Sequence, residues 1–338
     1  MGCELDDTRT DLGSPLVDAT GRRLEYLRLS VTEKCNFRCT YCLPGGCPKG
    51  AAEQPLSAPE IRRLLAAFAE LGFRKVRLTG GEPTLRTDIL ELVAAAAATP
   101  GVRHVGMTTN GYRLRGLAQD LADAGLSCLN VSVDSLDPER FTALTGCGQL
   151  DQVVGGVEAA LAAGIPRIKV NAVLMKGTDE DELERFLLWA RDVPITIRFI
   201  ELMQMGGDTG FFDRHHVPAA EVERWLLARG FAPVPRERID GPSTDYAHPG
   251  HRGRIGLIAP YKQGFCSTCN RLRVSSVGNL KLCLFADREL PLRPLLQSDA
   301  QRGELVAAVR TAVGAKPPSH HLDEGRTGNL RSLASIGG

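Results

Sequence analysis

The sequence predicts an α/β fold in which a partial (β/α)6 barrel of the TIM type precedes a C-terminal α+β extension. Three observations carry this prediction. Six strand-like runs alternate with helical stretches between residues 24 and 210, polar groups follow several of these runs, and short strands around a Pro- and Gly-rich run replace the pattern from residue 211 on. Alternating strands and helices favour a parallel sheet, and since eight units close a full barrel, six predict an open one.

The expected barrel strands span residues 26–31, 75–79, 103–108, 126–133, 167–174 and 195–200. Residues 57–60 form a capping box with Pro59 in the first turn, and apolar residues then recur at the 3.6-residue period as far as Leu71. A second helix with this period covers residues 183–190. Helices are therefore expected between the strands.

The extension is expected to hold a helix near residues 222–226, short strands at 254–258, 272–276 and 280–282, a hairpin turn at 276–279 and a last helix at 297–313. The chain thus divides into a lead-in (1–23), the barrel (24–210), the extension (211–325) and a tail (326–338) that ends in Gly337 and Gly338.

Composition excludes several classes of protein. The net charge of +1 over 338 residues gives no general argument for binding nucleic acid or an anionic membrane. The N-terminus lacks the apolar stretch of a secretory signal, and no apolar run approaches the length of a membrane span. Ten cysteines in such a chain indicate metal or redox chemistry in the cytoplasm rather than disulfides.

Three cysteines follow the first strand at a spacing of three and then two: Cys35, Cys39 and Cys42. Iron–sulfur cubanes usually take four thiolates, so three supplied by one loop leave one iron open. An open iron is what S-adenosylmethionine (SAM) needs for chelation and reductive cleavage. With Tyr41 directly before the last cysteine, the motif resembles the radical SAM superfamily. The alternative, a zinc site, wants a fourth nearby ligand, for which Cys47 is the only candidate.

Polar groups follow the next strands. Gly80 and Gly81 in a Gly-Gly-Glu-Pro segment let the backbone approach a ligand closely, and their amide and carbonyl groups can bond the amino and carboxylate groups of an amino acid. Thr108 ends the third strand and Ser132 the fourth. Parallel α/β sheets build their sites at such strand ends, so these residues are site candidates.

Single cations alternate with aliphatic residues in four of the strands: Arg28, Arg77, Lys169 and Arg198. Because side chains alternate between the two faces of a strand, these cations are expected to point into the barrel while the aliphatic residues pack on the helices. Unpaired buried cations are costly, which favours a polyanionic guest such as a triphosphate. The alternative is pairing with internal carboxylates, for which Glu82 and Glu201 are available.

A second set of three cysteines lies in the extension: Cys266, Cys269 and Cys283. One reading is a zinc site completed by His248 or His251. The other is a second iron–sulfur cluster with an open iron for substrate, to which Arg271 and Arg273 would add anion-binding groups. The remaining cysteines, among them Cys47, Cys128 and Cys147, are expected to be ordinary free thiols.

Together the motifs resemble the GTP 3',8-cyclase family of molybdenum cofactor (molybdopterin) biosynthesis from about residue 21 to the end. The resemblance rests on the first cysteine loop after LRLSVT, RLTGGEP, TTNG, NVSVDSLD, KVNAV, IRFIELM, FCSTCNRLR, CLF and the terminal Gly-Gly. It implies a radical SAM lyase with two 4Fe-4S clusters, one on each set of three cysteines. The radical formed from SAM would remove hydrogen from C3' of GTP, and C3' would then attack guanine C8 to give (8S)-3',8-cyclo-7,8-dihydroguanosine 5'-triphosphate.

The resemblance also implies roles for individual residues. The implied SAM contacts are Tyr41, Gly81, Ser132 and Met203. The implied GTP contacts are Arg28, Arg77, Thr108, Lys169, Arg271, Leu272 and Arg273. Gly337 and Gly338 would thread toward the active site. An electron donor such as flavodoxin is implied, and a homodimer is compatible. The alternatives are a peptide-modifying radical SAM enzyme with an auxiliary cluster and a non-catalytic zinc-binding protein.

Overall fold

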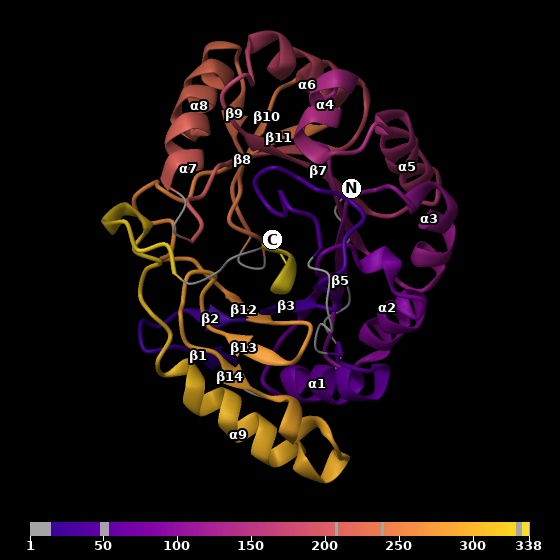
Figure 1. Cartoon of the computed structure of the whole chain (residues 1–338), viewed down its shortest axis with the longest axis vertical. Helices are drawn as coiled ribbons and strands as arrows, with labels where there is room; N and C mark the ends of the chain where they lie inside the picture. The colour runs from indigo at the N-terminus through magenta and orange to yellow at the C-terminus, as the bar shows by residue number, and fades with distance from the viewer. Residues whose placement is uncertain (1–14, 48–53, 207–208, 238–239, 329–332, 338) are drawn as a thin grey trace.

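The structure is a computed structural model that describes residues 15–47, 54–206, 209–237, 240–328 and 333–337. A ring of strands surrounds the centre of the molecule, and most helices lie outside it (Figure 1). The partial barrel that the sequence predicts is therefore confirmed.

The barrel strands lie within two residues of their predicted bounds. They are β3 (Tyr26–Ser30), β4 (Lys75–Thr79), β5 (His104–Thr109), β6 (Cys128–Ser132), β7 (Arg167–Leu174) and β8 (Thr196–Glu201). They pair in chain order, and every pair is parallel. Their carboxyl ends thus meet at one end of the barrel, which is where such folds build their sites.

The extension continues the barrel sheet on both sides, which the sequence did not reveal. Strand β12 (Arg271–Val274) pairs parallel with β3, and β11 (Arg254–Ile258) pairs parallel with β8. The remaining strands of this sheet are β13 (Asn279–Lys281), β14 (Leu290–Pro291), β10 (Thr244–Ala247) and β9 (Ala232–Pro233). Within the described residues β11 and β12 do not pair with each other, so the sheet of twelve strands stays open.

The helices are α1 (Ala58–Glu70), α2 (Ile89–Ala98), α3 (Leu114–Asp123), α4 (Pro138–Thr145), α5 (Leu150–Ala162), α6 (Glu180–Asp192), α7 (Thr209–His215), α8 (Ala219–Ala228) and α9 (Arg302–Val313). Short 3-10 turns are η1 (Pro83–Leu85), η2 (Arg293–Leu296), η3 (Asp299–Gln301), η4 (Leu322–Glu324) and η5 (Leu333–Ser335). The predicted capping box of α1 is confirmed. The last helix begins later than expected because Ser298 caps the separate turn η3.

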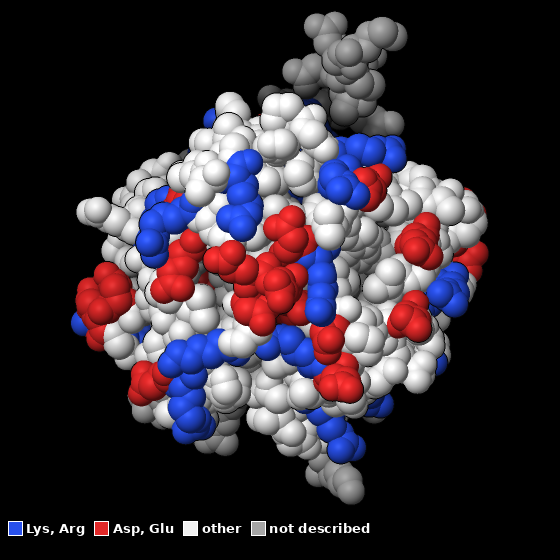
Figure 2. Space-filling view, turned by 90° about the horizontal axis from the view of Figure 1, so that it is seen from above, with Lys and Arg blue, Asp and Glu red and all other residues white. Residues whose placement is uncertain are grey.

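The predicted alternation of faces is also confirmed. Leu27 and Leu29 of β3 and Val76 and Leu78 of β4 are buried in the hydrophobic core between sheet and helices. The cations between them face the barrel interior and line a cavity there. On the face seen in Figure 2, acidic and basic side chains are interspersed around an acidic centre. No helix in the described ranges is long and apolar enough to cross a membrane.

The lead-in is partly structured. Strands β1 (Leu16–Val17) and β2 (Arg23–Leu24) form a small antiparallel ribbon. The ribbon precedes the first barrel strand, and Leu24 is fully buried in the core. The predicted polar lead-in thus contains a folded segment from residue 16 on.

Candidate active site

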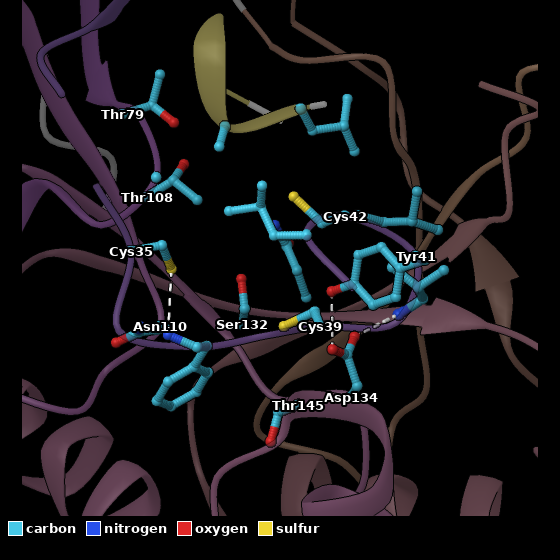
Figure 3. Close-up of a pocket in the computed structure, with 18 of the residues that line it drawn as sticks. Cys35, Cys39, Tyr41, Cys42, Thr79, Thr108, Asn110, Ser132, Asp134 and Thr145 are labelled. Carbon is cyan, nitrogen blue, oxygen red and sulfur yellow. Dashed lines mark hydrogen bonds between the residues drawn. The ribbon is translucent and has the colours of Figure 1, made fainter. Parts of the chain in front are cut away.

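One cavity is lined by the three cysteines of the first set, and we call it the thiol cavity. Figure 3 shows the sulfur atoms of Cys35, Cys39 and Cys42 turned toward the same space. Residues at the carboxyl ends of β4 to β8 complete its wall: Thr79, Gly80, Gly81, Thr108, Thr109, Asn110, Ser132, Asp134, Asn171, Val173, Ile200, Glu201, Leu202 and Met203. The four implied SAM contacts, Tyr41, Gly81, Ser132 and Met203, all line this cavity.

The two glycines after β4 serve first to bring the cysteine loop close. A Cβ on Gly80 would overlap the carbonyl oxygen of Thr32, and one on Gly81 would overlap that of Lys34. The Gly81 amide donates to the Thr32 carbonyl oxygen over 2.8 Å. This amide is thus engaged within the protein, and the expected contact of the segment with SAM stays a prediction. The carbonyl groups of this segment are the ones suited to an ammonium group of SAM.

Glu82 holds two strand ends together rather than neutralising the barrel cations. Its carboxylate accepts hydrogen bonds from Thr84, from the Thr109 hydroxyl (2.8 Å) and from the Asn110 amide (2.6 Å). The Asn110 side chain donates in turn to Asn36 of the cysteine loop over 2.8 Å. Burial raises the pKa of Glu82, although these hydrogen bonds oppose the shift.

Tyr41 is held by a carboxylate that the sequence did not single out. Its hydroxyl donates to Asp134 Oδ2 over 2.8 Å, as Figure 3 shows, and the Val173 amide donates to the other oxygen over 3.0 Å. Burial raises the pKa of Asp134. The contact ties the cysteine loop to β7 and fixes where Cys42 lies.

The thiols of this loop lie in surroundings that disfavour a negative charge. Burial raises the pKa of Cys35 to about 12, and burial together with the Asp134 carboxylate raises that of Cys39. Metal coordination deprotonates thiols, and a cationic iron centre would offset both effects. Three thiols on one loop, facing a cavity walled by strand ends, fit an iron–sulfur cluster with one open iron.

A second cavity lies deeper in the barrel and is lined by cations; we call it the cation cavity. In the sheet, Arg28 is the register partner of Arg77 on one side and of Arg273 on the other. Neighbouring strands lie about 4.8 Å apart, so the three arginines stand abreast in the sheet and their side chains enter one cavity. Lys75, Lys169, Arg198 and Arg271 also line this cavity.

The positive potential of the cation cavity appears in the pKa values of its other groups. Burial alone would raise the pKa of Tyr26, but Arg77, Arg28 and Lys75 lower it to about 7. Burial, reinforced by Arg198, lowers the pKa of Lys169 to about 8. These shifts reflect a positive potential, which favours the binding of an anion in this cavity.

Among the described residues, the alternative that internal carboxylates pair with the barrel cations is wrong for Arg77 and Lys169. Arg77 donates to the Tyr26 hydroxyl (2.7 Å), the Met107 carbonyl (2.7 Å) and the Cys128 sulfur (3.2 Å). Arg198 does pair with Asp245, over 3.4 Å. Glu201 binds His216 over 2.9 Å instead. In the part of the chain that the structure describes, Arg77, Lys169 and Arg273 form no ion pair.

The second cysteine set lines the cation cavity. Cys266, Cys269 and Cys283 lie there beside Phe265, Phe285 and His320. Burial would raise the pKa of Cys269, but Arg271 and Lys316 lower it to about 6. The zinc reading fails on position, because His248 and His251 contact each other (3.0 Å) and Phe231 instead. No three His, Cys, Asp or Glu side chains among the described residues gather around a single ion position.

Arg22 of the N-terminal ribbon clamps this second set. Its guanidinium binds Asp18 (2.6 Å) and donates to the carbonyl oxygens of Cys266 (3.1 Å), Pro317 (2.7 Å) and Pro318 (2.9 Å). Replacing it with alanine leaves the buried Asp18 carboxylate without its ion pair, and we expect a loss of about 3 kcal/mol in the free energy of unfolding. Urea unfolding measures this, and an Arg22→Ala protein as stable as the parent would contradict the clamp.

The two cavities share a wall, and the C-terminal segment enters between them. The residues that line both cavities are Asn171, Ile200, Met203, Arg273 and Leu284. Figure 1 shows the last turn, η5, inside the ring of strands. The Gly337 carbonyl accepts a hydrogen bond from Arg273 over 2.8 Å, and a Cβ on Gly337 would overlap the Thr79 side chain. Gly337 thus lies between Arg273 and Thr79, and its expected role at the active site stays a prediction, while Gly338 lies outside the described residues.

Most implied GTP contacts line the cation cavity, with two exceptions. Thr108 lines the thiol cavity instead, although Arg77 reaches its hydroxyl over 3.5 Å. The side chain of Leu272 is fully buried in the core and lines neither cavity, so the GTP contact implied for this residue stays a prediction. Tyr26, Lys75 and Asn171, which the sequence did not assign to a site, also line the cavity, as does Asn130 from the polar group that ends the fourth strand. Lys75 begins its strand on the same face as Arg77, and that position was the available signal.

Comparison with known proteins agrees with this geometry. Residues 29–190 match the Radical SAM superfamily, and residues 195–322 match the family described as Molybdenum Cofactor Synthesis C. A protein of Aeromonas hydrophila named GTP 3',8-cyclase is 52% identical over 330 residues, which cover 96% of each chain. One of Tolumonas auensis with the same name is 49% identical, again over 96% of each chain.

Among solved structures, Streptococcus suis SuiB bound to S-adenosylmethionine superposes with a TM-score of 0.62 at 14% identity. The superposition covers 85% of this chain and 68% of SuiB, and at this identity it speaks for the fold alone. The extent and level of identity to the named cyclases decide the family. This chain belongs to the GTP 3',8-cyclase family of the radical SAM superfamily.

Proposed function

We propose that the chain is a radical SAM lyase that converts GTP into (8S)-3',8-cyclo-7,8-dihydroguanosine 5'-triphosphate, the first step of molybdenum cofactor biosynthesis. The observation that carries the proposal is the row of Arg273, Arg28 and Arg77, abreast in one cavity that shares a wall with the thiol cavity. A polyanionic nucleotide and a source of radicals thereby lie next to each other.

In this proposal Cys35, Cys39 and Cys42 hold a 4Fe-4S cluster, and Gly81, Ser132 and Met203 contact SAM. The cluster with SAM supplies a carbon radical strong enough to remove an unactivated hydrogen atom. The protein's own part is to seat SAM at the strand ends and to exclude water. Asp134 assists by holding Tyr41 and with it the cysteine loop.

The cations hold the triphosphate. Arg28, Arg77, Arg271 and Arg273 suit bidentate contacts to phosphate oxygens, and Lys169 acts as a point charge. The second set of cysteines, on the wall of the same cavity, would hold a second 4Fe-4S cluster beside the guanine. Ribose then lies toward the shared wall, where hydrogen leaves C3' for the radical formed from SAM and C3' bonds to C8 of the base. One electron from the reducing system and one proton then go to the base, so the product keeps the composition of GTP.

Transfer of label tests this reaction. With GTP deuterated at C3', we expect deuterium in the 5'-deoxyadenosine released from SAM and a product of the mass of GTP with C3' joined to C8. Mass spectrometry measures both. Unlabelled 5'-deoxyadenosine formed during turnover of the labelled GTP would refute hydrogen abstraction at C3'.

Iron content tests the second cluster. The anaerobically reconstituted protein is expected to hold about eight iron atoms per chain, and the variant with Ser at 266, 269 and 283 about four. The loss is selective because the first loop is fixed by its own contacts to Asp134 and Asn110. An unchanged iron content in the variant would contradict the assignment of these cysteines.

The affinity for GTP should depend on pH through Lys169. With its pKa at about 8, this ammonium is charged below pH 8 and loses its proton as the pH rises through that value. The dissociation constant for GTP is therefore expected to rise about tenfold between pH 7 and 9. In Lys169→Arg the side chain stays charged, and the profile should flatten. A profile identical in both proteins would assign the pH dependence to another group.

We also propose a place for the chain in the cell. Its clustered thiols suit a reducing cytoplasm. Reductive cleavage of SAM requires a low-potential electron donor of the flavodoxin kind, and a homodimer is compatible with the fold. Gly337 would close the wall between the two cavities, because a residue without a side chain fits beside Thr79.

A further inference from the structure

Two buried amide oxygens of the cation cavity, one of them on the wall shared with the thiol cavity, have no hydrogen-bond donor within reach among the described residues. The Oδ1 atoms of Asn130 and Asn171 are buried and have no partner among the described residues. Asn130 is only 7% exposed and lines the cation cavity, and Asn171 lines both cavities. Buried polar atoms are nearly always paired, so two unpaired acceptors in one cavity point to a ligand that donates there.

The two asparagines lie on neighbouring strands and on the same face. Asn130 of β6 is the register partner of Lys169 of β7, and Ser132 is that of Asn171. Side chains two residues apart on a strand share a face, so both amides face the barrel interior at a diagonal offset. The terminal torsion of an asparagine is broad, which lets each amide turn toward a donor.

The chemistry of the proposed substrate identifies that donor. Triphosphate oxygens only accept hydrogen bonds, and in the proposed function the cations of this cavity already donate to them. The base donors would lie toward the second cysteine set. Of the donors on the nucleotide, the ribose hydroxyl groups are the ones left for the shared wall, where C3' must face the thiol cavity.

We infer that Asn130 and Asn171 accept hydrogen bonds from the 2' and 3' hydroxyl groups of the nucleotide and make the chain selective for ribonucleotides over deoxyribonucleotides. The inference rests on the proposed function. Holding both hydroxyls fixes the ribose ring and presents the hydrogen on C3' to the thiol cavity. These residues thus position the substrate for the reaction.

Binding measurements on the anaerobically reconstituted protein without SAM test the inference. We would titrate GTP, 2'-deoxyGTP and 3'-deoxyGTP calorimetrically into the parent protein, Asn130→Ala and Asn171→Ala. The parent is expected to bind GTP about tenfold more tightly than at least one deoxynucleotide, because a missing hydroxyl leaves an acceptor unpaired. Each variant should no longer prefer GTP over one of the two deoxynucleotides. The variant should still bind that deoxynucleotide about as tightly as the parent protein does.

Lys169→Ala is the matched comparison, since it should weaken all three nucleotides by the same factor. Thermal melts of the alanine variants, and of Asn130→Ser and Asn171→Ser, are measured alongside the titrations. They show whether a variant binds weakly because it has lost its fold. Asparagine variants that weaken GTP and both deoxynucleotides equally, or that leave every affinity unchanged, would overturn the inference while the proposed function stands. A parent protein that binds none of the nucleotides would overturn the proposed function as well.

Discussion

Replacing Cys35 with serine is expected to abolish cleavage of SAM. The three thiols of this loop line one cavity, and three are the number that leaves a cubane with a single open iron. A serine hydroxyl is a poor iron ligand, and the two remaining thiolates cannot hold a cubane with a single open iron. The measurement is 5'-deoxyadenosine released after anaerobic reconstitution and reduction.

Cys147→Ser is the matched control for this variant. Cys147 is a half-buried free thiol that lines neither cavity, so its replacement should leave SAM cleavage unchanged. Both variants should melt at similar temperatures in the absence of iron. If Cys35→Ser still released 5'-deoxyadenosine at the parent's rate, the cluster on this loop would have to be rejected.

Arg271→Ala is expected to weaken GTP binding about 10- to 100-fold. Arg271 lines the cation cavity and lies close enough to Cys269 to lower its pKa, so it bridges the phosphate site and the second cysteine set. Hydrogen bonds to charged groups contribute about 1.5–3 kcal/mol, which sets this range. SAM cleavage itself should persist slowly and uncoupled from substrate, because the thiol cavity is not altered.

Arg302→Ala provides the control for lost positive charge. Arg302 is exposed on α9 in the extension and should leave the GTP affinity as it was. Isothermal titration measures both variants at one ionic strength, since phosphate contacts depend on salt. Wild-type affinity in Arg271→Ala would mean that the second anion-binding group has been assigned wrongly.

The sequence allowed the barrel strands and the direction of their cations to be predicted, because both follow from local alternation. The register that sets Arg273, Arg28 and Arg77 abreast depends on pairing between β12 and β3. More than two hundred residues separate these strands in the chain, and no local pattern encodes such a contact. Strands β8 and β11 lie nearer to each other in the chain, but no local pattern encodes their pairing either.

Site residues that carry no charge were the hardest to predict. Asn130 and Asn171 are polar residues in alternating strands, and only the structure shows that their amide oxygens lack partners. Leu272 was implied as a contact by its place between two arginines, yet alternation puts its side chain in the core. Gly81 shows a third case, in which a residue suited to a ligand first serves the packing of the cysteine loop.

The most direct measurement is the formation of 5'-deoxyadenosine by the anaerobically reconstituted, dithionite-reduced protein with SAM, compared with and without GTP. The account predicts formation that rises with GTP and not with ATP or a panel of peptides. Formation indifferent to GTP, or stimulated by a peptide, would contradict the assignment of the cation cavity and favour a peptide-modifying enzyme. No formation from protein loaded with iron would contradict the open iron on Cys35, Cys39 and Cys42.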